Sequence, residues 1–270
     1  MAIIFGNIVA IYRRELQSYF VSPLAYIIAG IFWLLSGLFL ISILIGPDGI
    51  LSVVELLDAQ KSRISTPIPP IDVAYEFLQT FLDRMGWLLL FISPILSMGL
   101  YSQERKQGTL ELLATSPITN WSVALGKLLG VVTFFITMIL PIFALENIIL
   151  SYANPSISLL IPIVGHIGLI LLAAAILSLG MFISSLTEST VFSAILTFAA
   201  TLLLLFFDII ARGIGGSFGY VLGYLSPIKH YNSFIQGIFD TSSLIFFSSY
   251  IVLGIFLTSQ SIDVLNSQRE

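Results

Sequence analysis

The densest cluster of charged side chains outside the loop 46–83 lies in a short polar segment between two long hydrophobic runs. It contains Glu104, Arg105, Lys106 and Glu111, four charges within eight residues. Such charges form ion pairs and directional hydrogen bonds with a protein partner, whereas an apolar environment disfavours them. The segment therefore predicts a docking surface that faces the aqueous phase.

One pattern elsewhere in the chain is compatible with nucleophilic catalysis. Residues 215–219 read Gly-Gly-Ser-Phe-Gly and match the G-x-S-x-G pattern of a serine nucleophile. Paired with His166 or His230, Ser217 would make an intramembrane serine hydrolase. A glycine cluster between two apolar runs is far more often a flexible turn. We keep the hydrolase as an alternative.

No pattern for nucleotide hydrolysis or metal binding is present. A phosphate-binding loop requires a Gly-rich turn followed by Lys and Ser or Thr. The only Gly-Lys pair, Gly126-Lys127, is followed by two leucines inside a hydrophobic run. Neither histidine has a second histidine or a carboxylate three or four residues further on, and there is no cysteine. We expect this chain to bind no metal or cofactor, so any ATP hydrolysis must come from another chain.

The composition is that of an integral membrane protein. Of 270 residues, 57% are hydrophobic and 10% are charged, and the mean hydropathy is +1.02. A net charge of -4 argues against a nucleic-acid partner, because duplex binding needs a basic surface. About 20 apolar residues cross a membrane as one helix, so we predict an all-α domain over residues 1–270 with six transmembrane helices. The predicted spans are 24–45, 77–101, 122–150, 159–186, 189–210 and 244–265.

Six spans place both termini on one side of the membrane. The adjacent basic pairs Arg13-Arg14 and Arg105-Lys106 lie near span ends on that side, together with Lys127 and Arg269. The basic residues of the other side are spread through longer loops; they are Lys61, Arg63, Arg84, Arg212 and Lys229. Basic residues near span ends favour the cytoplasmic face. We therefore predict that both termini, and the polar segment, are cytoplasmic.

Residues 7–21 are predicted to form an amphipathic interface helix ahead of the first span. Its apolar side chains fall within an arc of about 120°, with Ile11 as the exception. The apolar set is Ile8, Val9, Tyr12, Leu16, Tyr19 and Phe20, and the polar set is Arg13, Arg14, Glu15, Gln17 and Ser18. We expect the helix to lie among lipid headgroups, with its basic pair toward anionic lipid. Ser22-Pro23 suits an N-cap and restart of the next helix. A simple anchor and a role in transmitting motion both remain open.

Three acidic residues lie within or beside apolar runs. Glu146, Glu188 and Asp208 are each near a predicted span end. There a carboxylate is satisfied by snorkelling or by headgroups, so a structural role is favoured over a functional one.

The polar segment closely resembles the signature of ABC-2 type permeases, the membrane subunits of a class of ABC exporters. The resemblance lies in residues 103–113, Gln-Glu-Arg-Lys-Gln-Gly-Thr-Leu-Glu-Leu-Leu, followed by Ser116-Pro117. Within that class the chain is most similar to the gliding-motility-associated permease and to its relative in nitrous-oxide-reductase maturation. Residues 12–23, 184–187 and 225–240 share in the resemblance, which covers nearly the whole chain except the acidic loop 46–83.

The resemblance implies a multi-pass protein of the bacterial plasma membrane that pairs with a second permease, identical or homologous. Two copies of a separate ABC ATPase would bind ATP and Mg and would dock on a coupling helix from about Thr109 to Thr115. The implied coupling residues are Glu104, Arg105, Gly108, Thr109, Leu110, Glu111, Leu112 and Leu113, with the leucines in a groove and the charges complementing it. Those of the interface helix are Tyr12, Arg13, Arg14 and Leu16. Residues 211–240 resemble a re-entrant hairpin in the outer leaflet.

A further alternative remains open beside the hydrolase. The acidic loop 46–83 would suit a membrane anchor that recruits an ATPase to an extracytoplasmic assembly. The spans lack a group of charges that would select an ion. That favours a lipid-like or polymeric cargo, or mechanical work on a partner.

Overall fold

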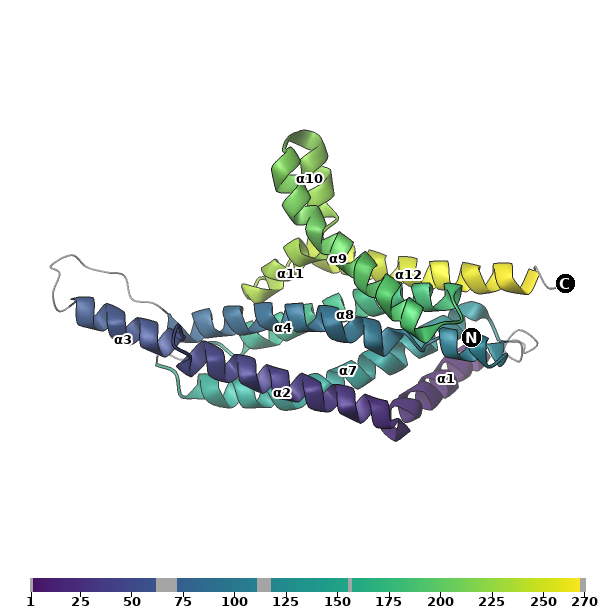
Figure 1. The fold of residues 1–270 in the computed structure, drawn as a ribbon, viewed down its shortest axis with the longest axis horizontal. Helices are drawn as coiled ribbons and strands as arrows, with labels where there is room; N and C mark the ends of the chain where they lie inside the picture. Colours follow the sequence, from purple (N-terminus) through teal and green to yellow (C-terminus); the bar gives the residue numbers. More distant parts are fainter. Residues whose placement is uncertain (1, 62–71, 111–117, 155–156, 268–270) are drawn as a thin grey trace.

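The computed structural model describes residues 2–61, 72–110, 118–154 and 157–267, and all regular structure in these ranges is helical (Figure 1). Six helices in the described part of the chain are long and apolar enough to cross a membrane, which confirms the number of predicted spans. These long helices are α2 Pro23–Ile45, α4 Val73–Ser97, α7 Asn120–Ser151, α8 Leu160–Leu186, α9 Thr190–Ile214 and α12 Thr241–Ser267.

Shorter helices precede or connect the long ones. They are α1 Ala2–Val21, α3 Ile50–Lys61, α5 Ser102–Lys106, α10 Gly216–Tyr224 and α11 Pro227–Ile235. The break between α1 and α2 falls at Ser22, whose backbone is extended, and Pro23 opens α2 as predicted. The Ser22 side chain makes no capping hydrogen bond, so the proline and the extended residue set this break.

Helix α8 is the centre of the bundle. It packs against α4, α7, α9, α11 and α12, and its buried residues include a run from Leu172 to Ser178. Helices α2 and α9 lie outside, and much of their apolar surface is exposed. A helix that exposes apolar side chains in this way faces lipid or another membrane protein.

The two ends of the bundle differ in what they carry. The beginning of α1 and the end of α12 lie at one end, and α3 projects beyond α2 and α4 at the other (Figure 1). Residues 46–61 and 72–83 of the acidic loop are described, and its Pro-rich turn at 67–70 lies outside the described residues. The polar segment joins α4 to α7 at the end opposite α3 (Figure 1).

Helices α10 and α11 form the connection between α9 and α12. Helix α10 packs along the end of α9 and projects away from the bundle, and α11 returns to α8 (Figure 1). Tyr231 of α11 is buried, and its hydroxyl donates a hydrogen bond of 2.7 Å to the carbonyl of Leu82. The two short helices agree with a hairpin, while its re-entrant position in a membrane stays a prediction.

Candidate functional site

The polar segment begins with the short helix α5 and a sharp turn at Gly108. The N–H of Thr109 donates to the carbonyl of Glu104 at 3.0 Å, and the N–H of Gly108 donates to that of Arg105 at 3.1 Å. This pair of bonds is a Schellman motif, which needs a left-handed residue, and Gly108 has φ +68°. Glycine adopts this conformation without the steric cost that a Cβ brings. Gly108 therefore directs the chain into the predicted coupling helix.

The predicted coupling helix is described only at its first two residues. Glu111, Leu112 and Leu113 lie outside the described residues. Leu110, which we expected to face a partner protein, is 7% exposed and belongs to the hydrophobic core of this chain. Leu110 therefore anchors the segment instead of presenting it.

Lys127 of α7 holds together three helices that are distant in sequence. Its Nζ lies 3.2 Å from Oε2 of Glu15 on α1 and 3.0 Å from Oε1 of Glu104 on α5. Arg14 of α1 lies 3.7 Å from the same Glu104 oxygen. We call Arg14, Glu15, Glu104 and Lys127 the charged cluster. Only 5% of the Lys127 side chain is exposed, so its charge is balanced inside the protein rather than by water.

Two glycines on α7 allow α1 to approach closely enough for this cluster to form. A Cβ on Gly126 would lie 2.8 Å from Cγ2 of Ile11, and a Cβ on Gly130 would lie 2.8 Å from the Cβ of Glu15. Glycines four residues apart make a flat strip on one face of a helix, a common contact surface between membrane helices. Because Lys127 lies on the same stretch, close packing and charge pairing occur together.

Helix α1 therefore has a protein-facing side that the predicted apolar arc did not include. We placed Ile11 outside the arc and Glu15 on the polar side, and both residues face α7. Arg13 and Arg14 are exposed, while Tyr12 and Leu16 are half-buried. The predicted arc covers one apolar surface, whereas α1 also packs against the glycine strip of α7, where Lys127 binds the Glu15 carboxylate.

Tyr19 adds an uncharged link between α1 and α4. Its hydroxyl donates a hydrogen bond of 2.8 Å to the carbonyl of Leu96. Burial, and then the nearby carboxylate of Glu15, raise the pKa of Tyr19, so the phenol stays protonated and remains a donor.

Arg105 connects α5 to the end of α8. Its guanidinium donates a 2.7 Å hydrogen bond to the carbonyl of Ser185 and lies 3.8 Å from the carboxylate of Glu188. The Ser184 hydroxyl accepts hydrogen bonds from the N–H groups of Tyr101 and Ser102 at 3.1 and 3.0 Å. The polar segment is thus fixed to α1, α7 and α8, and a displacement of α5 has to move or break these contacts.

Sequence reasoning missed Lys127 and Glu15 as site residues. The sequence marks Lys127 as a poor match to a phosphate-binding loop and as a basic residue of the cytoplasmic side, and it marks Glu15 as part of the polar face of the interface helix. The available signal was the small-xxx-small spacing of Gly126 and Gly130, with a lysine inside a run that is otherwise apolar. A lysine in such a run needs buried counter-ions, and those had to come from elsewhere in the chain.

The geometry gives the hydrolase alternative no support. His230 is bound through Nδ1 to the Ser243 hydroxyl at 3.1 Å and through Nε2 to the Tyr224 carbonyl at 2.9 Å. Burial lowers the pKa of His230, which favours its neutral ring. In the described part of the chain, no hydrogen bond joins Ser217 to His230 or His166.

The sequence predicts that lipid headgroups satisfy Glu146, and the structure shows a different environment. Its side chain is fully buried between α7 and α8, and its carboxylate lies 3.5 Å from Nε2 of His166. The position near a span end was read correctly, but the side chain points toward the neighbouring helix. A polar pair of this kind joins two helices across the bundle core.

The chain matches the family model described as ABC-2 family transporter protein over residues 9–260. A search of curated proteins found no match. The family match includes the first five long helices, α12 as far as residue 260, the charged cluster and the polar segment. On this match and this all-helical fold, the chain belongs to the ABC-2 family of transporter proteins and is a membrane subunit of an ABC transporter.

Proposed function

We propose that this chain is the permease subunit of an ATP-driven exporter, moved by a separate ABC ATPase and working as half of a permease pair. Two ATPase copies would bind ATP and Mg, and this chain would bind neither. The observation that carries the proposal is that the polar segment is fixed to three other helices through Lys127, Glu104 and Arg105. A surface that only docks a partner does not need such connections.

The connections supply a route for movement. Residues 111–113 would contact the ATPase, and force on them would reach α5 through Leu110 and the turn at Gly108. From α5, Glu104 passes it to α1 and α7, and Arg105 passes it to the end of α8. The ATPase cycle supplies the free energy, because a conformational equilibrium shifts only as far as the partner's differential affinity allows.

Glu104 and Arg105 take a different part in this proposal from the one implied by family resemblance. Their side chains are 14% and 15% exposed and are paired within the chain. They position the segment, while the exposed Lys106 and Gln107 and the residues 111–113 contact the ATPase. Charge complementarity then rests on Lys106 and Glu111.

The remaining features follow from this arrangement. The charged end of the bundle would face the cytoplasm of a bacterial cell, with both termini on that side of the plasma membrane. Helix α1 would lie among lipid headgroups, with Arg13 and Arg14 exposed to anionic lipid. Residues 211–240 would form the re-entrant hairpin, and the whole of 1–270 would act as one membrane unit. The relation to gliding-motility permeases rests on the sequence resemblance alone.

A charge-and-polarity swap tests the docking assignment. The double variant Glu111→Lys/Leu112→Asp should abolish co-purification with the ABC ATPase that drives this chain. The matched control is Glu55→Lys/Leu56→Asp, the same pair of changes at exposed residues of α3. The control should keep co-purification, and co-purification that survives Glu111→Lys/Leu112→Asp would contradict the docking assignment.

The projection of α3 beyond the bundle favours a second candidate function. A helix that extends past the membrane-spanning part at the end opposite the charged cluster suits an extracytoplasmic partner (Figure 1). The chain would then be an anchor that transmits ATPase motion without moving cargo. ATP-dependent movement of a lipid-like cargo in vesicles that hold only this permease and its ATPase would exclude the anchor.

A further inference from the structure

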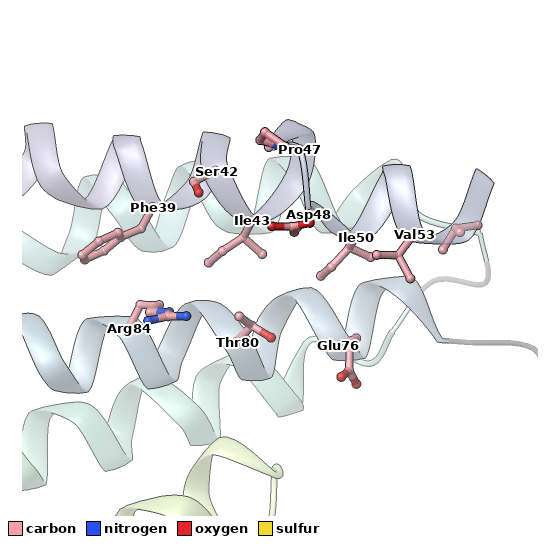
Figure 2. A pocket seen from close by; sticks show the side chains of 12 residues that line it. Phe39, Ser42, Ile43, Pro47, Asp48, Ile50, Val53, Glu76, Thr80 and Arg84 are labelled. Atoms are coloured by element: carbon pink, nitrogen blue, oxygen red, sulfur yellow. The ribbon is translucent and has the colours of Figure 1, made fainter. Parts of the chain in front are cut away.

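A cavity of about 700 Å³ lies at the end of the bundle opposite the charged cluster. Helices α2 and α3 form one wall and α4 forms the other (Figure 2). We call it the outer cavity. Its volume falls within the range of about 300 to 1,000 Å³ that is usual for sites of small molecules and cofactors.

One wall of the outer cavity is mainly apolar. Phe39 and Ile43 of α2 and Ile50 and Val53 of α3 line this side (Figure 2). Apolar side chains at the edge of a membrane helix bundle suit hydrocarbon chains, because they require no hydrogen-bond partner.

The opposite wall carries charge in a fixed order. Glu76, Thr80 and Arg84 are spaced four residues apart, so they follow one face of α4 (Figure 2). Glu76 is in the first turn, and Arg84 is about 12 Å further along the helix axis, toward the middle of the bundle. Asp48, on the turn between α2 and α3, adds a second carboxylate near the outer end.

These charges do not neutralise one another. In the described part of the chain, no ion pair or hydrogen bond joins the Arg84 guanidinium to Asp48 or Glu76. Arg84 is accessible from the cavity. A guanidinium at this depth binds phosphate with bidentate geometry, and carboxylates accept hydrogen bonds from a protonated amine.

We propose that the outer cavity binds an amino-phospholipid. Along the cavity, Arg84 lies deeper and the two carboxylates lie further out, while apolar residues of α2 and α3 line the facing wall over this whole length (Figure 2). Acyl chains would lie along the apolar wall formed by α2 and α3, the phosphate would pair with Arg84, and the primary amine would bind Asp48 and Glu76. The site is independent of the coupling role of the polar segment.

Native mass spectrometry of the purified full chain tests this assignment. The protein is incubated with an equimolar mixture of phosphatidylethanolamine, phosphatidylglycerol and phosphatidylcholine that share the same acyl chains. We expect retained phosphatidylethanolamine to dominate. Arg84→Gln should lower the retained phosphatidylethanolamine about tenfold, because it removes the charged phosphate partner. Glu76→Gln should lower the ratio of phosphatidylethanolamine to phosphatidylglycerol about threefold, because one amine acceptor is lost and Asp48 remains.

The controls separate this site from general surface charge. Arg212→Gln removes an exposed arginine of α9, whose partner is Asp208 at 2.6 Å, and should leave lipid retention unchanged. Arg84→Lys keeps the charge and should retain most of the lipid, and Arg84→Met serves as the loss variant if Arg84→Gln does not fold. Equal retention in the wild type and in Arg84→Gln would overturn the proposal.

Two further outcomes would also overturn it. A preference for phosphatidylglycerol that Glu76→Gln leaves unchanged would show that the cavity binds an anion and not a zwitterion. A two-copy species that is lost in Arg84→Gln, with lipid retention unaltered, would show that a second copy of this chain covers the cavity.

Discussion

The two ends of this bundle use charged residues in opposite ways. In the charged cluster, Lys127 pairs with Glu15 and Glu104 within 3.2 Å, and its side chain is almost fully buried. In the outer cavity, Arg84 lies on one helix face with Glu76, and no ion pair joins them in the described part of the chain. Ion pairs hold the helices together at the end with the charged cluster. At the other end the charges form no such pairs in the described part of the chain, and a cavity lies between the helices.

The difference shows what each arrangement is suited to do. Buried paired charges fix helices relative to one another, because separating them leaves a charge without water or a partner. Charges on a cavity wall that form no close ion pair in the described part of the chain keep their capacity to bind a ligand. The charged cluster should therefore matter for stability, and the outer cavity for ligand binding.

The largest expected effect comes from removing the central cation. Lys127→Met leaves Glu15 without its cation and Glu104 with only the 3.7 Å contact to Arg14, so it should lower the free energy of unfolding by about 3–5 kcal/mol. Arg84→Met makes the same kind of change in the outer cavity and should alter it by no more than about 0.5 kcal/mol. Reversible unfolding in mixed detergent measures both values.

A neutral version of the charged cluster provides the control. The triple variant Glu15→Gln/Lys127→Met/Glu104→Gln removes the unpaired charges together, so it should recover much of the stability lost in Lys127→Met. If Lys127→Met and Arg84→Met had equal effects, the contrast between the two ends would be wrong.

The next largest effect concerns the glycine strip that brings α1 against α7. Gly130→Ala puts a methyl group 2.8 Å from the Cβ of Glu15, so it should cost about 1–3 kcal/mol. Gly37→Ala in α2 meets no atom within 4 Å and should stabilise the helix by about 0.5–1 kcal/mol. Changes of opposite sign in the free energy of unfolding for these two glycine-to-alanine substitutions would establish the close contact between α1 and α7. Equal values would mean that α1 moves away at little cost.

A smaller effect is expected from neutralising one acid at each end. Glu104→Gln weakens the bond to Lys127 and should cost about 1–2 kcal/mol, because the amide keeps its shape but loses a charge-assisted contact. Glu76→Gln should leave the unfolding free energy unchanged within about 0.5 kcal/mol, because Glu76 is exposed at the cavity rim. The same unfolding titration compares the two, and a cost for Glu76→Gln as large as that for Glu104→Gln would place both ends in one class.

The six spans could be predicted because apolar runs of sufficient length are visible in the sequence, but their starts depend on polar residues outside the runs. Helix α4 begins at Val73, four residues before the predicted span, because the Asp72 side chain accepts the N–H of Tyr75. Helix α12 begins at Thr241, where the Asp240 carboxylate accepts from Ser243 and Ser242. These same bonds lower the pKa of Asp240. Hydropathy does not register such caps.

The candidate site could be predicted only in part, because residue type identifies charge and not its partner. The polar segment stood out as charged, yet Glu104 pairs with Lys127 on α7 and with Arg14 on α1. These contacts depend on helix packing rather than on spacing along the chain. The burial of Leu110 also depends on helix packing. In a polar segment, the hydrophobic residues do not repeat with a regular spacing that would indicate which side of the segment is buried.

The smallest expected effect is a difference in how strongly salt acts on the two ends of the bundle. Between about 0.1 M and about 1 M salt the Debye length falls from about 10 Å to about 3 Å, and accessible charges are screened far more than buried ones. Retained phosphatidylethanolamine should fall about two- to threefold over this range, because Arg84 and Glu76 are accessible. The stability lost in Lys127→Met should change by no more than about 0.5 kcal/mol, because salt reaches the charged cluster poorly. If instead the Lys127→Met penalty falls with salt as strongly as lipid retention does, the charged cluster is as open to solvent as the outer cavity, and the two ends differ only in degree.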